Sequence, residues 1–422
     1  MRQAEIDSRK GGRLRRHRNS NTGPLPRFTP AYAPALGRAP MHALVRLPDC
    51  ATETTGPITG FGPTSDSEHV LIHQHAGTPI GERIVVSGRV LDTSGRPITR
   101  NLVEIWQANS AGRYAAPADH YDGPLDPNFT GTGRCLTDTD GWYRFTTIMP
   151  GSHRSDHRCD AWRPPHIHFS VMGTTFNQRL ITQMYFPGDP LLREDPIVQA
   201  APEPQRSHLI SRLDHAIGEN GWARGYRFDI VLPDVPHPLP AHRPHTAPVS
   251  DTWQTPPQTI GPFFAPALLR SHWHNAAHDN DPIAIELTGT VYDGAGKPVP
   301  HTLIETWQPD PRGNSNGQFT RTSTGSTGHY RLRTARPRTN AATDAAPHIA
   351  LSLFTSGLND RVITRVYLAD DPSGNATDPV LAALPADRRR TLLAHPERTD
   401  LTTRYRFDIA LQGNEETVFF RV

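Results

Sequence analysis

Residues 161–170 read Ala-Trp-Arg-Pro-Pro-His-Ile-His-Phe-Ser, and this stretch decides how we interpret the chain. After the two prolines, His166 and His168 stand two residues apart in a run that alternates like a β-strand. Alternate residues of a strand face the same side, so we expect both imidazoles to converge while Ile167 and Phe169 face away. Neutral imidazole is the commonest metal ligand. The pair therefore predicts a metal site, and a surface pair in a chain with 22 His is the plainer alternative.

An internal repeat surrounds this stretch. Residues 83–109 (RIVVSGRVLDTSGRPITRNLVEIWQAN) correspond to residues 283–310 (IAIELTGTVYDGAGKPVPHTLIETWQPD), and the motif YRFDI occurs at 226–230 and again at 405–409. The second copy lacks about 19 residues between its Trp and its His. A repeat of this length predicts two copies of one fold in a single chain.

The repeat predicts the domain organisation. We expect a disordered basic tail over residues 1–28, a first domain over 29–236, a Pro- and His-rich linker over 237–254 and a second, homologous domain over 255–422.

Each copy is predicted to be all-β. Short alternating or β-branched runs are separated by Gly, Pro, Asn and Asp, with no long helical period between them. Two tandem β-sandwich domains with long loops fit this pattern best. Short helices are expected within 196–216 and 379–394. The expected strands include residues 84–92, 102–108, 141–148, 166–172 and 226–232.

Composition excludes several classes of function. The 44 Lys and Arg against 42 Asp and Glu leave a net charge of +2, which gives no field for a nucleic-acid partner. No apolar run is long enough to span a membrane, and the basic tail is not followed by the apolar segment of a secretory signal. Three Cys make a poor disulfide framework, so we expect free thiols and a cytoplasmic protein.

The two copies differ at the candidate metal site. The first has His166-Ile167-His168 where the second has His348-Ile349-Ala350. The segment that the second copy lacks, 109–134, contains Tyr114. We therefore expect only the first domain to bind a metal, and the second to shape a pocket or an interface.

With these motifs the chain resembles the intradiol ring-cleaving dioxygenases of the protocatechuate 3,4-dioxygenase type, with a β-type half first and an α-type half second. The resemblance extends from about residue 29 to the end. The motifs that carry it are 81–84 (GERI), 103–109 (VEIWQAN), 125–129 (LDPNF), 133–138 (GRCLTD), 162–169, 180–189 (LITQMYFPGD), 258–262 (QTIGP), 416–420 (ETVFF) and both YRFDI runs.

The resemblance implies a mononuclear non-haem Fe(III) held by two Tyr and two His. Tyr114, His166 and His168 match three of these ligands. The fourth position, which follows Pro150-Gly151 and is tyrosine in the family, is His153. Imidazole is neutral and does not supply the charge of a phenolate. Tyr121, His120 and His157 are local alternatives as the fourth ligand.

The resemblance also implies a substrate pocket. Arg163 matches the arginine that stabilises charge on the substrate, and Tyr114 would maintain the ferric state. Phe263 stands where the family has tyrosine, Ser155 where it has tryptophan, and Ser356 where it has the arginine that holds a substrate carboxylate. The remaining positions that match pocket residues are Tyr32, Arg38, Trp106, Gln183, Ile197, Thr259, Gly261 and Pro262.

The activity implied is the cleavage of a protocatechuate-like catechol between its hydroxyl-bearing carbons with O2, giving a cis,cis-muconate. Fe(III) is the only cofactor expected, and the fused chain is expected to form a homo-oligomer. Because of His153 and Ser356, the alternatives are an iron protein with another substrate or chemistry, and a catalytically impaired homologue.

Overall fold

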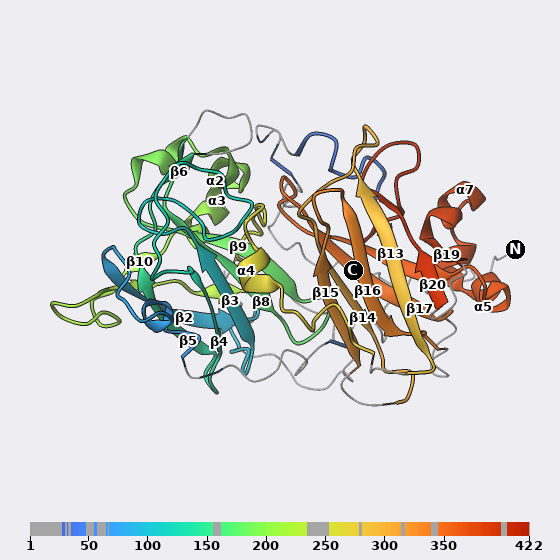
Figure 1. Ribbon diagram of the computed structural model, residues 1–422, viewed down its shortest axis with the longest axis horizontal. Coiled ribbons are helices and arrows are strands. Elements are labelled where there is room, and N and C mark those ends of the chain that lie inside the picture. The colour runs from blue at the N-terminus through green and yellow to red at the C-terminus, as the bar shows by residue number, and fades with distance from the viewer. Residues whose placement is uncertain are drawn as a thin grey trace, which may run out of the picture.

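The computed structural model describes residues 28–29, 32, 35–47, 55–56, 65, 67–154, 162–233, 253–277, 281–313, 317–338, 345–397 and 403–421. Most of the expected tail and linker, together with Ser155, His157, Cys50 and Cys159, lie outside these residues. Figure 1 shows two groups of strands side by side, one formed by residues before the linker and one by residues after it. We call them the N-terminal half and the C-terminal half.

The described residues of the N-terminal half form three sheets. In the first sheet β2 pairs with β5 antiparallel and with β11 and β12 in parallel. In the second sheet β8 lies between β3 and β9, and β4 extends the other side of β3. The third is the short pair β6–β7. The bounds are β2 Arg83–Leu91, β3 Leu102–Gln107, β4 Thr132–Leu136, β5 Trp142–Ile148, β6 His153–Arg154, β7 Trp162–Arg163, β8 His166–Met172, β9 Arg179–Tyr185, β10 Arg212–Leu213, β11 Arg224–Arg227 and β12 Ile230–Val231.

The C-terminal half repeats this pairing. β13 pairs with β16, β20 and β21 as β2 does with β5, β11 and β12, and β17 lies between β14 and β18 as β8 does between β3 and β9. The equivalent strands β2 and β13 even share one pattern of burial along nine residues. The bounds are β13 Ala284–Tyr292, β14 Leu303–Gln308, β15 Gln318–Ser323, β16 His329–Ala335, β17 His348–Phe354, β18 Val362–Leu368, β19 Leu393–Glu397, β20 Thr403–Arg406, β21 Ile409–Ala410 and β22 Phe420–Arg421.

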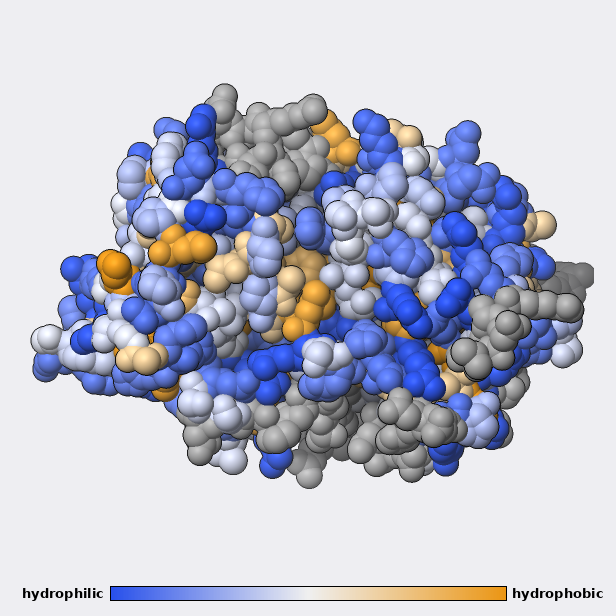
Figure 2. Space-filling model, in the orientation of Figure 1, coloured by the Kyte–Doolittle hydropathy of each residue, from blue (hydrophilic) through white to orange (hydrophobic). Residues whose placement is uncertain are grey.

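Hydrophobic side chains of alternating strand residues fill a separate core in each half. Val86, Phe145, Ile105 and Phe169, from β2, β5, β3 and β8, pack in one cluster of fully buried residues. The matching strands of the C-terminal half form a second cluster of the same kind. Figure 2 shows that the face seen in Figure 1 is mostly hydrophilic, with hydrophobic side chains in small separate patches.

Helices are few and short, so the all-β prediction is confirmed. Those expected after Pro196 and Pro379 are present, and each begins at a proline preceded by a capping aspartate. The described residues contain no helix long and apolar enough to cross a membrane. The tandem-sandwich arrangement and the domain limits stay predictions. The helices are η2 Leu71–His73, η3 Pro190–Arg193, α2 Pro196–Ala200, α3 Glu203–Arg206, η4 Ser207–Leu209, α4 Ala265–Leu268, α5 Pro372–Thr377, α6 Pro379–Ala382, α7 Ala386–Arg389 and η5 Arg390–Leu392.

A buried ionic network joins the two halves. The guanidinium of Arg321 on β15 contacts Glu104 on β3 at 2.8 Å and Glu305 on β14 at 2.9 Å. Arg179 on β9 donates to both carboxylate oxygens of Glu305 at 3.0 Å. All four side chains are buried. Buried charges are tolerated only when they are paired, so this network fixes how the halves dock.

The segment before the N-terminal half also contacts the C-terminal half. β1 (Val45–Arg46) pairs in parallel with β22 at the far end of the chain. Upstream of β1, the Arg38 guanidinium donates to the carbonyl oxygen of Ser356 at 2.8 Å. Residues from this segment therefore reach the boundary between the halves, where Tyr32 is buried.

Candidate functional site

His166 and His168 lie on β8, an interior strand of the second sheet between β3 and β9. The strand register places Trp106 of β3 and Gln183 of β9 beside His168, and Tyr185 of β9 beside His166. Both imidazoles point to one side of the sheet, and their Nε2 atoms are 3.2 Å apart. The indole of Trp106 stacks on the ring of His168, at 4.7 Å between centroids and 7° between planes. The convergence expected from the alternating sequence is thus present.

Tyr114 reaches the same point from the loop after β3. Its backbone N–H donates to Asp119 Oδ2 at 2.7 Å, and its hydroxyl oxygen lies 3.4 Å from His166 Nε2. The loop passes tightly over the segment that leads to His153. A Cβ at Gly112, which has a φ of +82°, would lie 2.2 Å from the carbonyl oxygen of Ser152. Glycine is required there both by the backbone angle and by the close approach.

Two of the separations among the three donor atoms match those between ligands of one metal ion. Two ligand atoms about 2.1 Å from a metal, at angles of about 90–110°, are about 3.0–3.4 Å apart. The separations of 3.2 Å and 3.4 Å agree with this. No group of three or more His, Cys, Asp or Glu suited to a metal occurs in the described part of the chain.

The protonation states suit metal binding. Burial, together with the charge of Arg163, lowers the pKa of His166 and His168 well below the usual value for histidine. His166 Nδ1 donates to the carbonyl oxygen of Pro164 at 2.8 Å, because a carbonyl can only accept. Its Nε2 consequently carries the lone pair that a metal needs. Burial raises the pKa of the Tyr114 hydroxyl, so a cation is needed to stabilise its phenolate.

Arg163 lies beside the imidazoles, and its guanidinium is held in one orientation by hydrogen bonds. Its Nε donates to Asp195 Oδ2 at 2.8 Å, and its Nη2 donates to Gln183 Oε1 at 2.8 Å and to the Tyr185 hydroxyl at 3.0 Å. Although burial opposes the charge, the carboxylate of Asp195 raises the pKa of Arg163 above its ordinary value. A permanent positive charge thus stands beside the three donor atoms.

His153 also faces the site. Its ring centroid lies 5.1 Å from that of His166 and 5.6 Å from that of Tyr114. Burial, followed by the charge of Arg163, lowers the pKa of His153 to about 3. Of the other candidates for the fourth ligand, Tyr121 and His120 do not line the cavity: Tyr121 packs against Trp162 at 6.4 Å between ring centroids, and His120 is exposed. His157 lies outside the described residues.

The loop before α4 of the C-terminal half closes the site. Gly261 has a φ of +68° and approaches the ring of His168, since a Cβ built there would lie 3.6 Å from His168 Cε1. The ring of Phe263 lies 4.8 Å from that of Tyr114. The backbone of Thr259 is anchored because its carbonyl oxygen accepts from Gln183 Nε2 at 2.8 Å.

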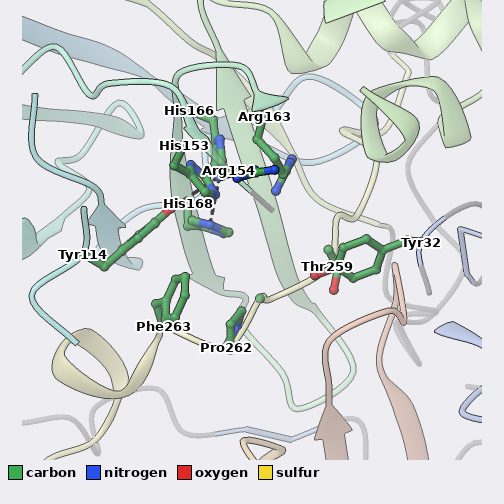
Figure 3. A pocket seen from close by; sticks show the side chains of 11 residues that line it. Tyr32, Tyr114, His153, Arg154, Arg163, His166, His168, Thr259, Pro262 and Phe263 are labelled. Carbon is green, nitrogen blue, oxygen red and sulfur yellow. Dashed lines mark hydrogen bonds between the residues drawn. The ribbon is translucent and has the colours of Figure 1, made fainter. Parts of the chain in front are cut away.

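These side chains enclose a cavity of about 420 Å³, including its open mouth. Figure 3 shows side chains from both halves facing it. The residues that line it are Tyr32, Tyr114, His153, Arg154, Arg163, His166, His168, Thr259, Gly261, Pro262 and Phe263.

Five of the described positions that the resemblance assigned to the substrate pocket do not line this cavity. Trp106 and Gln183 contact lining residues, as described above. Ile197 is fully buried in α2 behind Arg163. Arg38 and Ser356 contact each other, and burial lowers the pKa of Arg38.

Sequence reasoning missed three residues of the site. Arg154 lines the cavity, while Asp195 and Tyr185 hold Arg163. Two signals were available: Asp195 precedes Pro196, as a helix-capping residue would, and Tyr185 lies two residues from Gln183 on the same face of a strand. No local pattern points to Arg154.

Comparisons with known proteins give matches in both halves of the chain. A family model described as Dioxygenase matches residues 55–234 and 260–413. The chain is similar to the protocatechuate 3,4-dioxygenase beta chain of Burkholderia cepacia, with 50% identity over 205 residues that make up 48% of this chain and 87% of that protein. It is also similar to the alpha chain from the same organism, with 36% identity over 193 residues, or 40% of this chain and 98% of that one. Catechol 1,2-dioxygenase 2 of Acinetobacter lwoffii is 31% identical over 156 residues, which are 33% of this chain and 52% of that protein.

Proposed function

The chain belongs to the intradiol ring-cleaving dioxygenases and carries beta-like and alpha-like parts in one polypeptide, and on this premise we propose that it is a non-haem Fe(III) enzyme. Its substrate is a catechol, which it cleaves with O2 between the two hydroxyl-bearing carbons to give a cis,cis-muconate. The observation that carries the proposal is the convergence of three donor atoms: the Tyr114 hydroxyl lies 3.4 Å from His166 Nε2, which in turn lies 3.2 Å from His168 Nε2.

The donor set suits Fe(III). Neutral imidazoles and an anionic phenolate oxygen are hard or borderline ligands that match a trivalent ion. The buried phenol of Tyr114, whose pKa is raised without a metal, becomes a good ligand once a cation neutralises its charge. Bound iron would supply Lewis acidity that lowers the pKa values of the catechol hydroxyls.

The protein residues position the substrate and stabilise its charge. Arg163 is held by three acceptors, so its guanidinium needs no reorganisation when negative charge develops on the ring. The loop of Thr259, Gly261 and Pro262 covers the cavity from the C-terminal half and excludes water, which strengthens every electrostatic interaction inside.

A second candidate is an iron protein of this family with altered chemistry or little activity. Two departures favour it. His153 stands at the position of a second phenolate, so one anionic ligand is missing. Ser356 replaces the arginine expected to hold a carboxylate, and it does not line the cavity.

Metal content and turnover separate these candidates. A ferric phenolate is coloured, so the purified chain should contain about one iron per protein and show a visible absorption band that Tyr114→Phe abolishes. Oxygen uptake is then measured with a panel of catechols. A coloured, iron-loaded protein that consumes no oxygen with any of them would support the second candidate. A colourless protein that binds no added iron would refute both.

A further inference from the structure

Trp106 contacts a candidate metal ligand without facing the cavity. It lies on β3 opposite His168 of β8, and it is 1% exposed. Its indole stacks on the imidazole of His168, with 4.7 Å between the centroids and 7° between the planes. Trp106 is not among the residues that line the cavity. Its influence on the site therefore passes through the side chains that it contacts, and His168 is the one against which its ring lies flat.

The two imidazoles of β8 are held in different ways. His166 Nδ1 donates to the carbonyl oxygen of Pro164 at 2.8 Å. His168 Nδ1 is buried and has no hydrogen-bond partner among the residues that the structure describes. A metal-bound histidine is almost always oriented by a hydrogen bond from its second ring nitrogen. Within the described part of the chain, another contact has to orient His168.

Stacking on Trp106 supplies such a restraint. Of the aromatic contacts described for His168, that with Trp106 is parallel, whereas the ring of His166 meets it at 69° and that of Tyr114 at 59°. An offset parallel arrangement is one of the favoured geometries of aromatic pairs. Rotation of the imidazole about its Cβ–Cγ bond would break this contact and would move Nε2 from its position 3.2 Å from His166 Nε2. The stack therefore favours the ring orientation in which the two Nε2 atoms can share a metal.

The C-terminal half contains the same tryptophan without an imidazole to orient. Trp307 of β14 lies opposite Ala350 of β17, in the register that places Trp106 opposite His168. Trp307 is 2% exposed, and its Nε1 donates to Thr55 Oγ1 at 3.3 Å. Trp106 Nε1, by contrast, has no hydrogen-bond partner in the described part of the chain. The fold thus offers an internal control, a buried tryptophan at the equivalent position that stands against alanine in place of a candidate ligand.

We propose that Trp106 is a positioning residue that orients His168 for metal binding by stacking, and that it does not act by contacting the substrate. This inference rests on the proposed function, because it needs a metal bound by Tyr114, His166 and His168. A ligand that already has the required orientation loses less conformational freedom when the metal binds. The stack should therefore raise the affinity for the metal, whereas a tryptophan that only fills the core would raise the stability of the fold alone.

The test measures the affinity of the full chain for Co(II), after bound metal has been removed with a chelator, by a titration followed in visible absorption. Trp106→Leu removes the flat ring, and Trp106→Phe keeps a smaller one. Trp307→Leu and Trp307→Phe are the matched controls in the C-terminal half. Urea unfolding of the same metal-free proteins separates an effect on the site from an effect on the fold.

For Trp106→Leu we expect the affinity for Co(II) to fall about tenfold, the loss typical of removing a residue that orients a metal ligand. Trp106→Phe should recover part of the loss. Trp307→Leu and Trp307→Phe should stay within about twofold of the wild type in affinity, although both should lower the stability. If a leucine variant does not fold, the phenylalanine variants decide, because Trp106→Phe should still lose more affinity than Trp307→Phe.

Two results would overturn the inference: no loss of affinity in any Trp106 variant that folds, or losses that are equal at the two tryptophans. If the wild type binds Co(II) and consumes oxygen with catechols but shows one of these results, the inference fails and the proposed function stands. If the Trp106 variants lose affinity selectively but no catechol is consumed, the dioxygenase activity fails and the positioning role stands. A wild type that binds neither Co(II) nor iron contradicts both.

Discussion

Replacing Asp195 with asparagine tests how the site keeps a buried positive charge in place. Arg163 is 8% exposed and Asp195 is 1% exposed, and their Nε and Oδ2 atoms are 2.8 Å apart. Removing one partner of a buried ion pair costs about 3–5 kcal/mol. Gln183 and Tyr185 still accept from Arg163 in the variant. We therefore expect Asp195→Asn to lower the free energy of unfolding by about 3 kcal/mol, the low end of that range.

Asparagine removes the negative charge of Asp195 and keeps the second role of this side chain, which is to cap a helix. Asp195 Oδ1 also accepts from the N–H groups of Ile197 and Val198 and so caps α2. Asparagine caps helices about as well as aspartate, so the cap is kept. Its amide nitrogen, or its neutral oxygen, then faces Arg163 without a charge. Asp195→Ala would lose the cap as well, at a further cost of about 1 kcal/mol.

Urea unfolding of Asp195→Asn, Arg163→Gln and the double variant measures this coupling. If the two side chains form the pair described, the double variant should be about 2–3 kcal/mol more stable than the sum of the single effects predicts. Oxygen uptake by Asp195→Asn should also fall, because Arg163 is no longer held. Single effects that add to within about 0.5 kcal/mol would refute the reasoning.

Three other changes test separate parts of the structure. Ion pairs with Arg179 and Arg321 outweigh burial and lower the pKa of Glu305 from 4.5 to about 2. The stability that these ion pairs contribute is complete above about pH 4.5 and is lost as the pH falls toward 2. The urea midpoint of the wild type should therefore drop over this pH window, and that of Glu305→Gln should drop less. An equal drop of the midpoint in both proteins would argue against a lowered pKa of Glu305. Gly261→Ala should lower the free energy of unfolding by about 1–2 kcal/mol, because Gly261 has a positive φ. The added methyl group near His168 should also raise the KM for catechol. An unchanged KM would place the loop away from the substrate. His153→Tyr should strengthen iron retention against a chelator and raise oxygen uptake, and if neither changes, His153 is not at the metal.

Local patterns were enough to predict the strands and the pair of histidines. Strand alternation has a period of two residues, so residues 166–172 alone indicated that His166 and His168 share one side. The repeat likewise predicted that the second half reuses the strands of the first, because equivalent sequences bury equivalent side chains. The strand period is visible within a few consecutive residues, and the repeat is visible when two segments of the chain are compared directly.

The rest depended on contacts between residues that are distant along the chain. No pattern in the sequence brings Arg163 to Asp195, or Arg321 to Glu104 of the other half. The same holds for the cavity wall, where Arg154 lies opposite the loop of Gly261. The sequence by itself determined the β-strands and the His166–His168 pair through short-range periodicity, and the duplication through the comparison of two segments, while Tyr114 and His153 became candidate ligands through the resemblance. Only the tertiary structure decided which charges meet and which residues face the cavity, because packing and the pairing of buried charges are properties of the whole folded chain.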